Sequence, residues 1–143
     1  ATKAPPIAAL ASLLTDPGLA AIFIAPSNPW LSIDPILAIP SLAAALRSTT
    51  APVIAISPIV GGRALKGPTA KVMGELGVPV SAGAIAAHYG DLLDGFILDD
   101  ADRAEADALI ADGLAVGATH TVMSTLEDRI HLAEFALGFA APR

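Results

Sequence analysis

The sequence predicts an α/β fold built on a mostly parallel sheet. Three observations indicate it: short apolar runs bounded by proline or glycine, helical patterns between those runs, and a continuous rather than alternating apolar character within each run. Continuous apolar runs are typical of strands covered on both faces. Strands that alternate with helices indicate βαβ units, whose strands pair in parallel.

Four strands are expected from these runs. The second is the clearest, because β-branched residues dominate it and Pro52 and Pro58 bound it. The four strands are expected over residues 21–25, 53–57, 95–98, and 115–117 continued by 119–123.

Helices are expected between and after the strands. They are predicted over residues 40–47, 68–76, 81–89, 101–112 and 126–139. Gly77, Gly90 and Gly113 follow three of them, as glycine often does at the end of a helix. Another helix start is expected at Pro35, which heads an apolar stretch after the first strand.

Composition limits the possible partners. The 143 residues correspond to about one domain, and 8 basic against 14 acidic residues give a net charge of −6. This balance argues against nucleic acid as a partner. The chain has no cysteine and no apolar stretch long enough to cross a membrane, and Pro5, Pro6 and Pro17 break a signal-peptide pattern. A cytoplasmic protein is therefore expected.

The loop after the first strand carries the sequence Ser27-Asn28-Pro29-Trp30, followed by Ser32. In an open parallel sheet, ligands bind at the loops that leave the carboxyl ends of strands. The Asn28 amide is suited to donate to a phosphate oxygen. Trp30 is suited either to anchor the packing of the loop or to stack on a ligand ring.

The loop after the second strand combines glycine with positive charge. Gly61 and Gly62 let the backbone bend or approach a ligand, and Arg63 and Lys66 add positive charge before a predicted helix start. The spacing is not that of a P-loop. Two interpretations remain open: a glycine turn beside a solvated basic patch, or a phosphate site.

Two further segments have both a structural and a functional interpretation. Asp99, Asp100 and Asp102 follow the third strand, where carboxylates cap a helix N-terminus or help to bind Mg²⁺. His88 and Tyr89 end a predicted helix, where a histidine commonly bonds to the last carbonyls, although a substrate contact is also open.

Several segments closely resemble one enzyme family. They are "IAPSNPWLSIDPILAIP", "APVIAISPIVGGRALKGPTAKVMGELGVPVSA", "HYGDLLDGFILDDAD" and "TVMSTLEDRIHLAEFALGFA". In order and spacing they are similar to the 2-phospho-L-lactate transferase family (CofD/FbiA) of coenzyme F420 biosynthesis. The resemblance spans roughly residues 19–140.

The resemblance implies a Rossmann-like three-layer fold and a transfer reaction at phosphorus. A phospholactyl, phosphoenolpyruvyl or phosphoglyceryl group would move from a guanosine-diphosphate-linked donor to the deazaflavin Fo, with release of GMP and a requirement for Mg²⁺. The nucleotide- and phosphate-binding candidates are Ser27, Asn28, Pro29, Ser32, Gly61, Gly62, Arg63 and Lys66. Possible substrate contacts are Trp30, His88 and Tyr89.

The same resemblance implies that residues 1–143 form the C-terminal half of the family's fold. The N-terminal half, with its Gly-rich loop, is expected to supply the catalytic and metal-binding groups, so no metal ligand is assigned here and the chain alone is expected to be inactive. The N-terminal half and a second copy of the enzyme are the expected protein partners. The alternative is a non-catalytic regulator related to the gluconeogenesis-factor family, which binds nucleotides or nucleotide-sugars.

Overall fold

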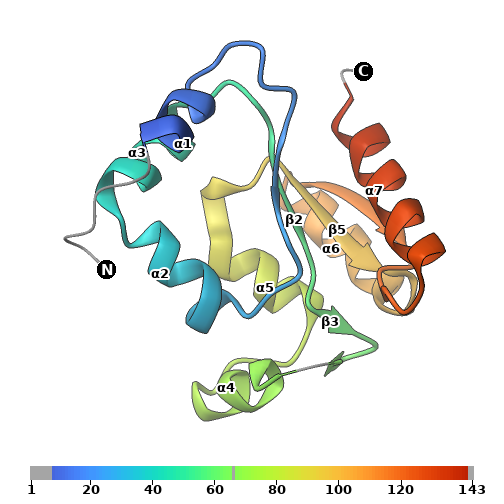
Figure 1. Ribbon diagram of the computed structural model, residues 1–143. Coiled ribbons are helices and arrows are strands. Elements are labelled where there is room, and N and C mark those ends of the chain that lie inside the picture. The colour runs from blue at the N-terminus through green and yellow to red at the C-terminus, as the bar shows by residue number, and fades with distance from the viewer. Residues whose placement is uncertain (1–7, 66, 142–143) are drawn as a thin grey trace.

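Four parallel strands form the main sheet of the computed structural model, which describes residues 8–65 and 67–141 (Figure 1). Their order in the sheet, β1-β2-β5-β6, is also their order along the chain. The parallel sheet and its flanking helices confirm the predicted α/β, Rossmann-like fold. The strands are β1 (Ile22–Ile24), β2 (Val53–Ile56), β5 (Gly95–Asp99) and β6 (Ala115–Thr119).

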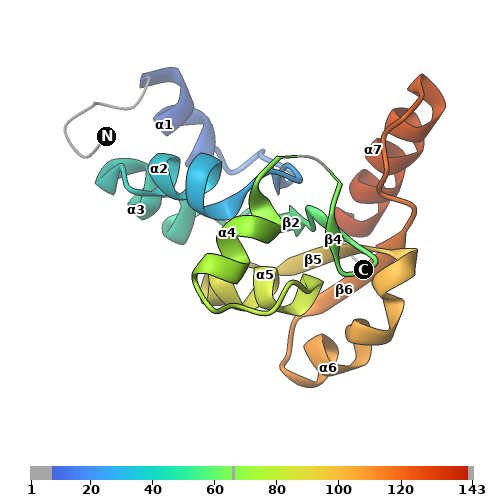
Figure 2. The same cartoon turned by 90° about the horizontal axis from the view of Figure 1, so that it is seen from below.

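The helices form layers on both faces of this sheet. Because each new strand is added at the same edge, right-handed crossovers place the connecting helices on one face. Figure 2 shows α4, α5 and α6 on one side of the sheet and α7 on the other. These helices are α4 (Thr69–Glu75), α5 (Ala82–Tyr89), α6 (Ala106–Ala111) and α7 (Leu126–Ala140), with a short 3₁₀ turn at Gly90–Leu92.

Alternate residues of the central strands enter two separate cores. Val53, Ala55 and Phe96 point toward α5 and pack with its buried residues. Ile54, Ile56 and Ile97 point to the opposite face and pack against Leu132 and Ala136 of α7. The continuous apolar runs in the sequence therefore reflect a sheet that is covered on both faces.

Two glycines allow α7 to lie close to the sheet. A Cβ atom on Gly95 would come within 2.8 Å of the Phe139 ring, and one on Gly117 would lie 3.0 Å from the ring of Phe135. Both glycines are buried, on the strands β5 and β6. The missing side chains thus make room for the two phenylalanine rings.

The N-terminal helices group beside β1, the first strand of the sheet (Figure 1). Leu14, Leu42 and Ala45 form a small core there, with Ile22 packed against it. The Pro35 helix start is confirmed, since this residue lies in the first turn of a short helix. The elements of this region are α1 (Ala8–Leu14), a π-helix (Pro29–Ile33), α2 (Asp34–Leu37) and α3 (Pro40–Ser48).

The fourth strand is shorter than its sequence pattern predicts. It ends at Thr119, so the prediction of strand structure is wrong over 120–123. The backbone N–H of Thr121 donates to the Asp99 carboxylate at 2.8 Å instead of joining a strand ladder. This side-chain bond turns the following segment across the end of the sheet.

Two other elements differ from the prediction. The first half of the helix expected over 101–112 is a 3₁₀ helix (Asp100–Glu105), a geometry that is frequent at helix N-termini, and α6 follows it. A small antiparallel hairpin of β3 (Ile59–Val60) and β4 (Arg63–Ala64) stands after β2, where a loop was expected. Gly61 and Gly62, both with positive φ, form its tight turn.

No single helix in the described ranges is long and apolar enough to cross a membrane. Among the described residues, the helical segments Pro29–Leu37 and Pro40–Ser48 would together be long and apolar enough, but they are bent by 87° to each other.

Candidate functional site

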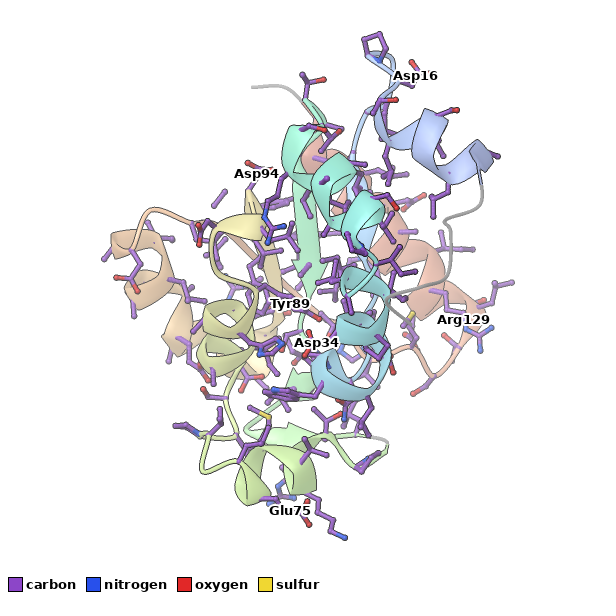
Figure 3. The ribbon with its side chains drawn as sticks, turned by 90° about the vertical axis from the view of Figure 1, so that its left-hand side faces the viewer. Asp16, Asp34, Glu75, Tyr89, Asp94 and Arg129 are labelled. Carbon is purple, nitrogen blue, oxygen red and sulfur yellow. The ribbon has the colours of Figure 1, made fainter. Side chains whose placement is uncertain are left out.

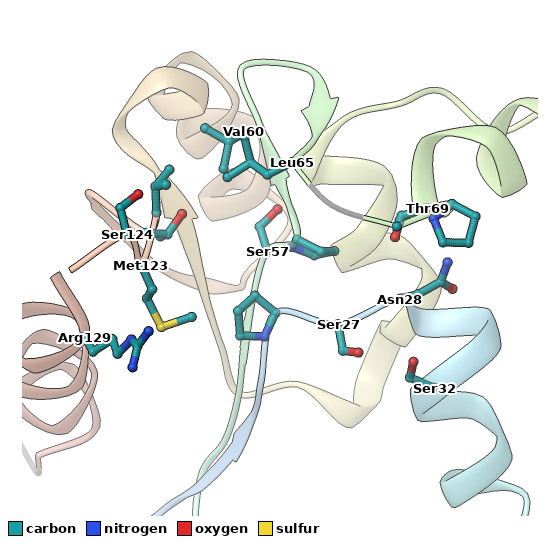
Figure 4. Close-up of a pocket in the computed structure, with 16 residues that line it drawn as sticks. Ser27, Asn28, Ser32, Ser57, Val60, Leu65, Thr69, Met123, Ser124 and Arg129 are labelled. Atoms are coloured by element: carbon teal, nitrogen blue, oxygen red, sulfur yellow. The ribbon is translucent and has the colours of Figure 1, made fainter. Parts of the chain in front are cut away.

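A cavity of about 760 Å³ opens at the carboxyl end of the sheet, beyond the ends of β1, β2 and β6. This is the edge at which open parallel sheets bind ligands. Figure 4 shows Asn28, Ser32 and Thr69 at one end of the cavity, Met123 and Arg129 at the other, and Ser57 between them. The lining residues are Pro26, Ser27, Asn28, Ser32, Ser57, Pro58, Val60, Leu65, Gly67, Pro68, Thr69, Thr121, Val122, Met123, Ser124 and Arg129.

Asn28 is the buried polar residue on which the site depends. Its Oδ1 accepts a hydrogen bond of 3.0 Å from the backbone N–H of Leu31 and so caps the π-helix. Its Nδ2 has no hydrogen-bond partner among the described residues, although the side chain is only 9 % exposed. Buried amide N–H groups are nearly always paired, so a buried donor without a partner marks Asn28, a residue of the cavity lining, as a candidate to bind a ligand.

Two of the buried hydroxyl groups nearby already have partners. Ser57 Oγ donates to the carbonyl of Ile59 and accepts from its N–H, both at 3.1 Å. Thr121 Oγ1 donates to Asp99 at 3.0 Å. These two side chains shape the cavity wall, while the Asn28 amide is left to interact with its contents.

Asp99, at the end of β5, is turned away from the cavity. Its carboxylate accepts from the backbone N–H groups of Ala101 and Thr121 and from the Thr121 hydroxyl. Burial opposes ionisation of this group, but the hydrogen bonds from Ala101 and Thr121 outweigh it, and the pKa of Asp99 is lowered. The carboxylate is therefore a structural anion that holds the turn after β6.

Asp102 occupies the donors of the glycine turn. Its Oδ2 accepts from the Gly61 N–H at 2.9 Å and its Oδ1 from the Gly62 N–H at 3.0 Å, and the side chain is buried. The phosphate interpretation of this loop needs these N–H groups, and the structure gives both to a carboxylate of the protein itself. Asp99 and Asp102 thus follow the structural interpretation of the acidic segment.

The structure distributes the predicted binding residues unevenly. Ser27, Asn28 and Ser32 line the cavity, whereas Pro29 is buried behind it. Gly61, Gly62 and Arg63 are exposed on the hairpin and are not part of the lining. Lys66 lies outside the described residues.

Trp30, His88 and Tyr89 form a cluster of their own outside the cavity lining. His88 Nε2 lies 2.9 Å from Asp34 Oδ1, and the ring centroids of Trp30 and His88 are 4.7 Å apart. Burial, and then the nearby Asp34 carboxylate, raise the pKa of Tyr89 well above its usual range. Asp34 and Tyr89 are seen in Figure 3, and the cluster ties α2 to α5.

No group of three or more His, Cys, Asp or Glu side chains in the described ranges is arranged to hold a metal ion. Mg²⁺ in proteins is usually held by one or two carboxylates together with substrate phosphates. Asp99 and Asp102, two of the acidic candidates in the segment after the third predicted strand, already accept two or more hydrogen bonds each. These residues do not fit a magnesium site.

The sequence interpretation missed one side of the cavity. Residues 121–124 and Arg129 line it, as do Ser57 and Thr69. The sequence pattern predicts strand structure up to residue 123, whereas the segment 121–124 follows the last parallel strand at the same edge. The rule that selected the Asn28 loop also applies to this segment, once the end of the strand is known.

Comparison with known proteins defines the class to which this fold and cavity belong. The family model "2-phospho-L-lactate transferase CofD" matches residues 4–128. The chain is 40% identical over 120 residues to a phosphoenolpyruvate transferase of Kitasatospora aureofaciens, with 83% of this chain and 37% of the relative covered. It is 38% identical over 117 residues to a 2-phospho-L-lactate transferase of Methanosarcina acetivorans, with coverage of 82% and 38%.

A 2-phospho-L-lactate transferase of Methanocaldococcus jannaschii is 36% identical over 118 residues, which is 82% of this chain and 36% of the relative. The chain therefore belongs to the 2-phospho-L-lactate transferase family, a family of transferases in coenzyme F420 biosynthesis. The match spans less than two fifths of the length of these relatives.

Proposed function

We propose that this chain forms the donor-binding part of a transferase that attaches a phospho-acid group to the deazaflavin Fo. The donor is a guanosine-diphosphate-linked phospholactyl, phosphoenolpyruvyl or phosphoglyceryl group. The terminal ribityl hydroxyl of Fo attacks the phosphorus that carries the acid. The bond from this phosphorus to the bridging oxygen breaks, GMP leaves with the electron pair, and the hydroxyl proton passes to a base.

The observation that carries this proposal is the buried Nδ2 of Asn28, which has no partner among the described residues and belongs to a residue that lines the cavity. An unpaired buried donor costs about 1–3 kcal/mol, and a ligand oxygen that accepts from it removes this cost. Because Oδ1 is held by the Leu31 N–H, the amide can offer only its N–H₂ group. The complementary ligand atom is an acceptor, such as a phosphate oxygen of the donor.

The charge of the lining supports a phosphorylated ligand. No Asp or Glu lines the described cavity, and Arg129 adds a positive charge to it. In a chain with 14 acidic residues and a net charge of −6, such a lining favours an anion. The names of the related proteins, phosphoenolpyruvate transferase and 2-phospho-L-lactate transferase, also favour a transferase over a regulator.

The described lining offers no group to activate the attacking hydroxyl. It contains no His, Asp, Glu or Lys. We propose that the base comes from a part of the enzyme outside the described residues, which agrees with the expectation that the N-terminal half supplies the catalytic groups. The chain alone would then bind GDP without transferring a group to Fo.

Titration of GDP into the chain by calorimetry tests this proposal. Asn28→Ser keeps an oxygen that can cap the Leu31 N–H but removes the amide donor. We therefore expect the free energy of unfolding to change by less than about 1 kcal/mol. A hydrogen bond to a charged group is worth about 1.5–3 kcal/mol, so affinity for GDP should fall about 10- to 150-fold.

Ser81→Ala is the matched control, because it removes a helix cap at α5, outside the cavity lining. It should cost stability without changing GDP affinity. Parent-like binding of GDP by Asn28→Ser, or no binding by the parent chain, would overturn the proposal. An equal loss in Ser81→Ala would show that the effect acts through folding.

A further inference from the structure

Arg129 stands at the end of the cavity opposite Asn28 (Figure 4). It follows the first residues of α7 and is exposed at the cavity wall. In the part of the chain that the structure describes, it is the charged side chain of the lining and makes no ion pair with a carboxylate. Its guanidinium is therefore available to a ligand.

The carboxylates closest to this position are committed to the backbone. Asp128 accepts from the N–H groups of Ser124 and Thr125 at 2.9 and 2.8 Å, in a capping box at the start of α7. Hydrogen bonds from Thr125 and Ser124 lower the pKa of Asp128, so it stays ionised in this cap. Asp99 is held by Ala101 and Thr121. Neither carboxylate forms an ion pair with Arg129.

We propose that Arg129 is the anion-recognising residue of this cavity and that it selects ligands carrying a second oxyanion beyond the acceptor bound by Asn28. The inference rests on the proposed function and deepens it. A guanidinium presents paired N–H donors that match the oxygens of a carboxylate or a phosphate. The shared chemistry is thus an oxyanion, either the carboxylate of the phospho-acid or a phosphate of the nucleotide.

The apolar side chains around Arg129 strengthen this assignment. Met123 and Val122 line the same part of the chain's cavity and contribute no competing donor or acceptor of comparable strength. Apolar surface beside a charge lowers the effective dielectric constant, which strengthens its attraction to an anion. Asn28 then orients the ligand through its uncharged N–H₂ donor, while Arg129 contributes the positive charge.

Calorimetric titrations of GDP and of phosphoenolpyruvate into Arg129→Gln and Arg129→Lys test the assignment. Because the side chain is exposed, we expect Arg129→Gln to lose about five- to tenfold in affinity for the ligand whose oxyanion it binds. Arg129→Lys, which keeps the positive charge, should retain more of this affinity. The salt dependence of binding should also flatten in Arg129→Gln, since one ion pair is lost.

Arg47→Gln is the matched control, because it makes the same change in net charge at an exposed position outside the cavity lining. A loss that includes GDP identifies a phosphate of the nucleotide, and a loss confined to phosphoenolpyruvate identifies an oxyanion of the phospho-acid. If Arg129→Gln binds both ligands like the parent, or no more weakly than Arg47→Gln, the inference is wrong. If Asn28→Ser still loses affinity in that case, the proposed function stands without it.

Discussion

Two regions at the same edge of the sheet present N–H donors, and they differ in what those donors bind. At the glycine turn, the Gly61 and Gly62 N–H groups both donate to the Asp102 carboxylate. In the loop after β1, the Nδ2 of Asn28, a residue of the cavity lining, has no partner among the described residues. A binding site therefore depends on which donors remain unpaired after folding, and not only on where donors occur.

The difference has a simple energetic origin. A carboxylate of the protein is tethered close to the glycine turn and needs no binding from solution, so it outcompetes a dilute external anion for the two N–H groups. Asn28 uses its single side-chain acceptor for the Leu31 N–H, which leaves only a donor. No acceptor of the described chain reaches that donor.

The largest effect that would test this comparison is expected from Asp102→Ala. Two hydrogen bonds to a charged acceptor are lost, but the exposed turn can be hydrated, so we expect a destabilisation of about 2–3 kcal/mol. Urea unfolding measures it. GDP affinity should not change, because the turn is outside the cavity lining.

Asp102→Asn provides the graded control for this change. It keeps one oxygen as an acceptor and should cost about half as much stability as the alanine variant. Tighter GDP binding by Asp102→Ala would reverse the comparison, because it would reveal the glycine turn as a phosphate site masked by the protein's own carboxylate.

A second effect concerns Asp99, the other carboxylate held by the backbone at this edge. Because its pKa is lowered in the folded state, its stabilisation is present above the unfolded-state pKa and is lost as the pH falls through the folded-state pKa. Thr121→Val removes one donor, so the folded-state pKa should rise and stability at neutral pH should fall by about 1–2 kcal/mol.

Unfolding of the parent and of Thr121→Val at neutral and acidic pH measures this effect. The difference between the two proteins should shrink once the carboxylate is protonated in both states. A difference that is the same at every pH would mean that Thr121 contributes through packing and not through Asp99.

The smallest effect is expected from Gly62→Ala. The residue has φ of 69°, and a Cβ atom there would meet nothing nearer than the Val80 carbonyl oxygen at 3.8 Å. Only backbone strain opposes the substitution, so we expect a cost of about 1 kcal/mol and unchanged GDP affinity. A loss of GDP binding without a loss of stability would show that the glycine turn takes part in GDP binding.

The sequence predicted the layers of the fold well because both faces of the sheet are buried. The continuous runs around Val53–Ile56 and Gly95–Asp99 correspond to strands with buried residues on both faces. The ends of elements were less predictable, because side chains determine them. The segment after Thr119 looks like strand until the Asp99 carboxylate is seen to capture its backbone.

The site was predictable only in part. Asn28 could be selected because it follows a strand at the binding edge of a parallel sheet. Arg129 could not, because it lies on α7 and reaches the cavity only through the turn at 121–124. The pairing of Asp102 with Gly61 and Gly62 was also out of reach, since it joins residues about 40 positions apart in the sequence.

The hairpin turn, finally, is exposed to solvent although its N–H groups are hydrogen-bonded within the protein. Gly61 and Gly62 lie at the surface, but their N–H groups are held by a buried side chain of the Asp100–Glu105 helix. Exchange of these two amide hydrogens with solvent therefore requires the hairpin to separate from that helix. Their exchange rates report the opening of this contact, so a turn that looks like a loose surface loop behaves as part of the rigid frame around the cavity.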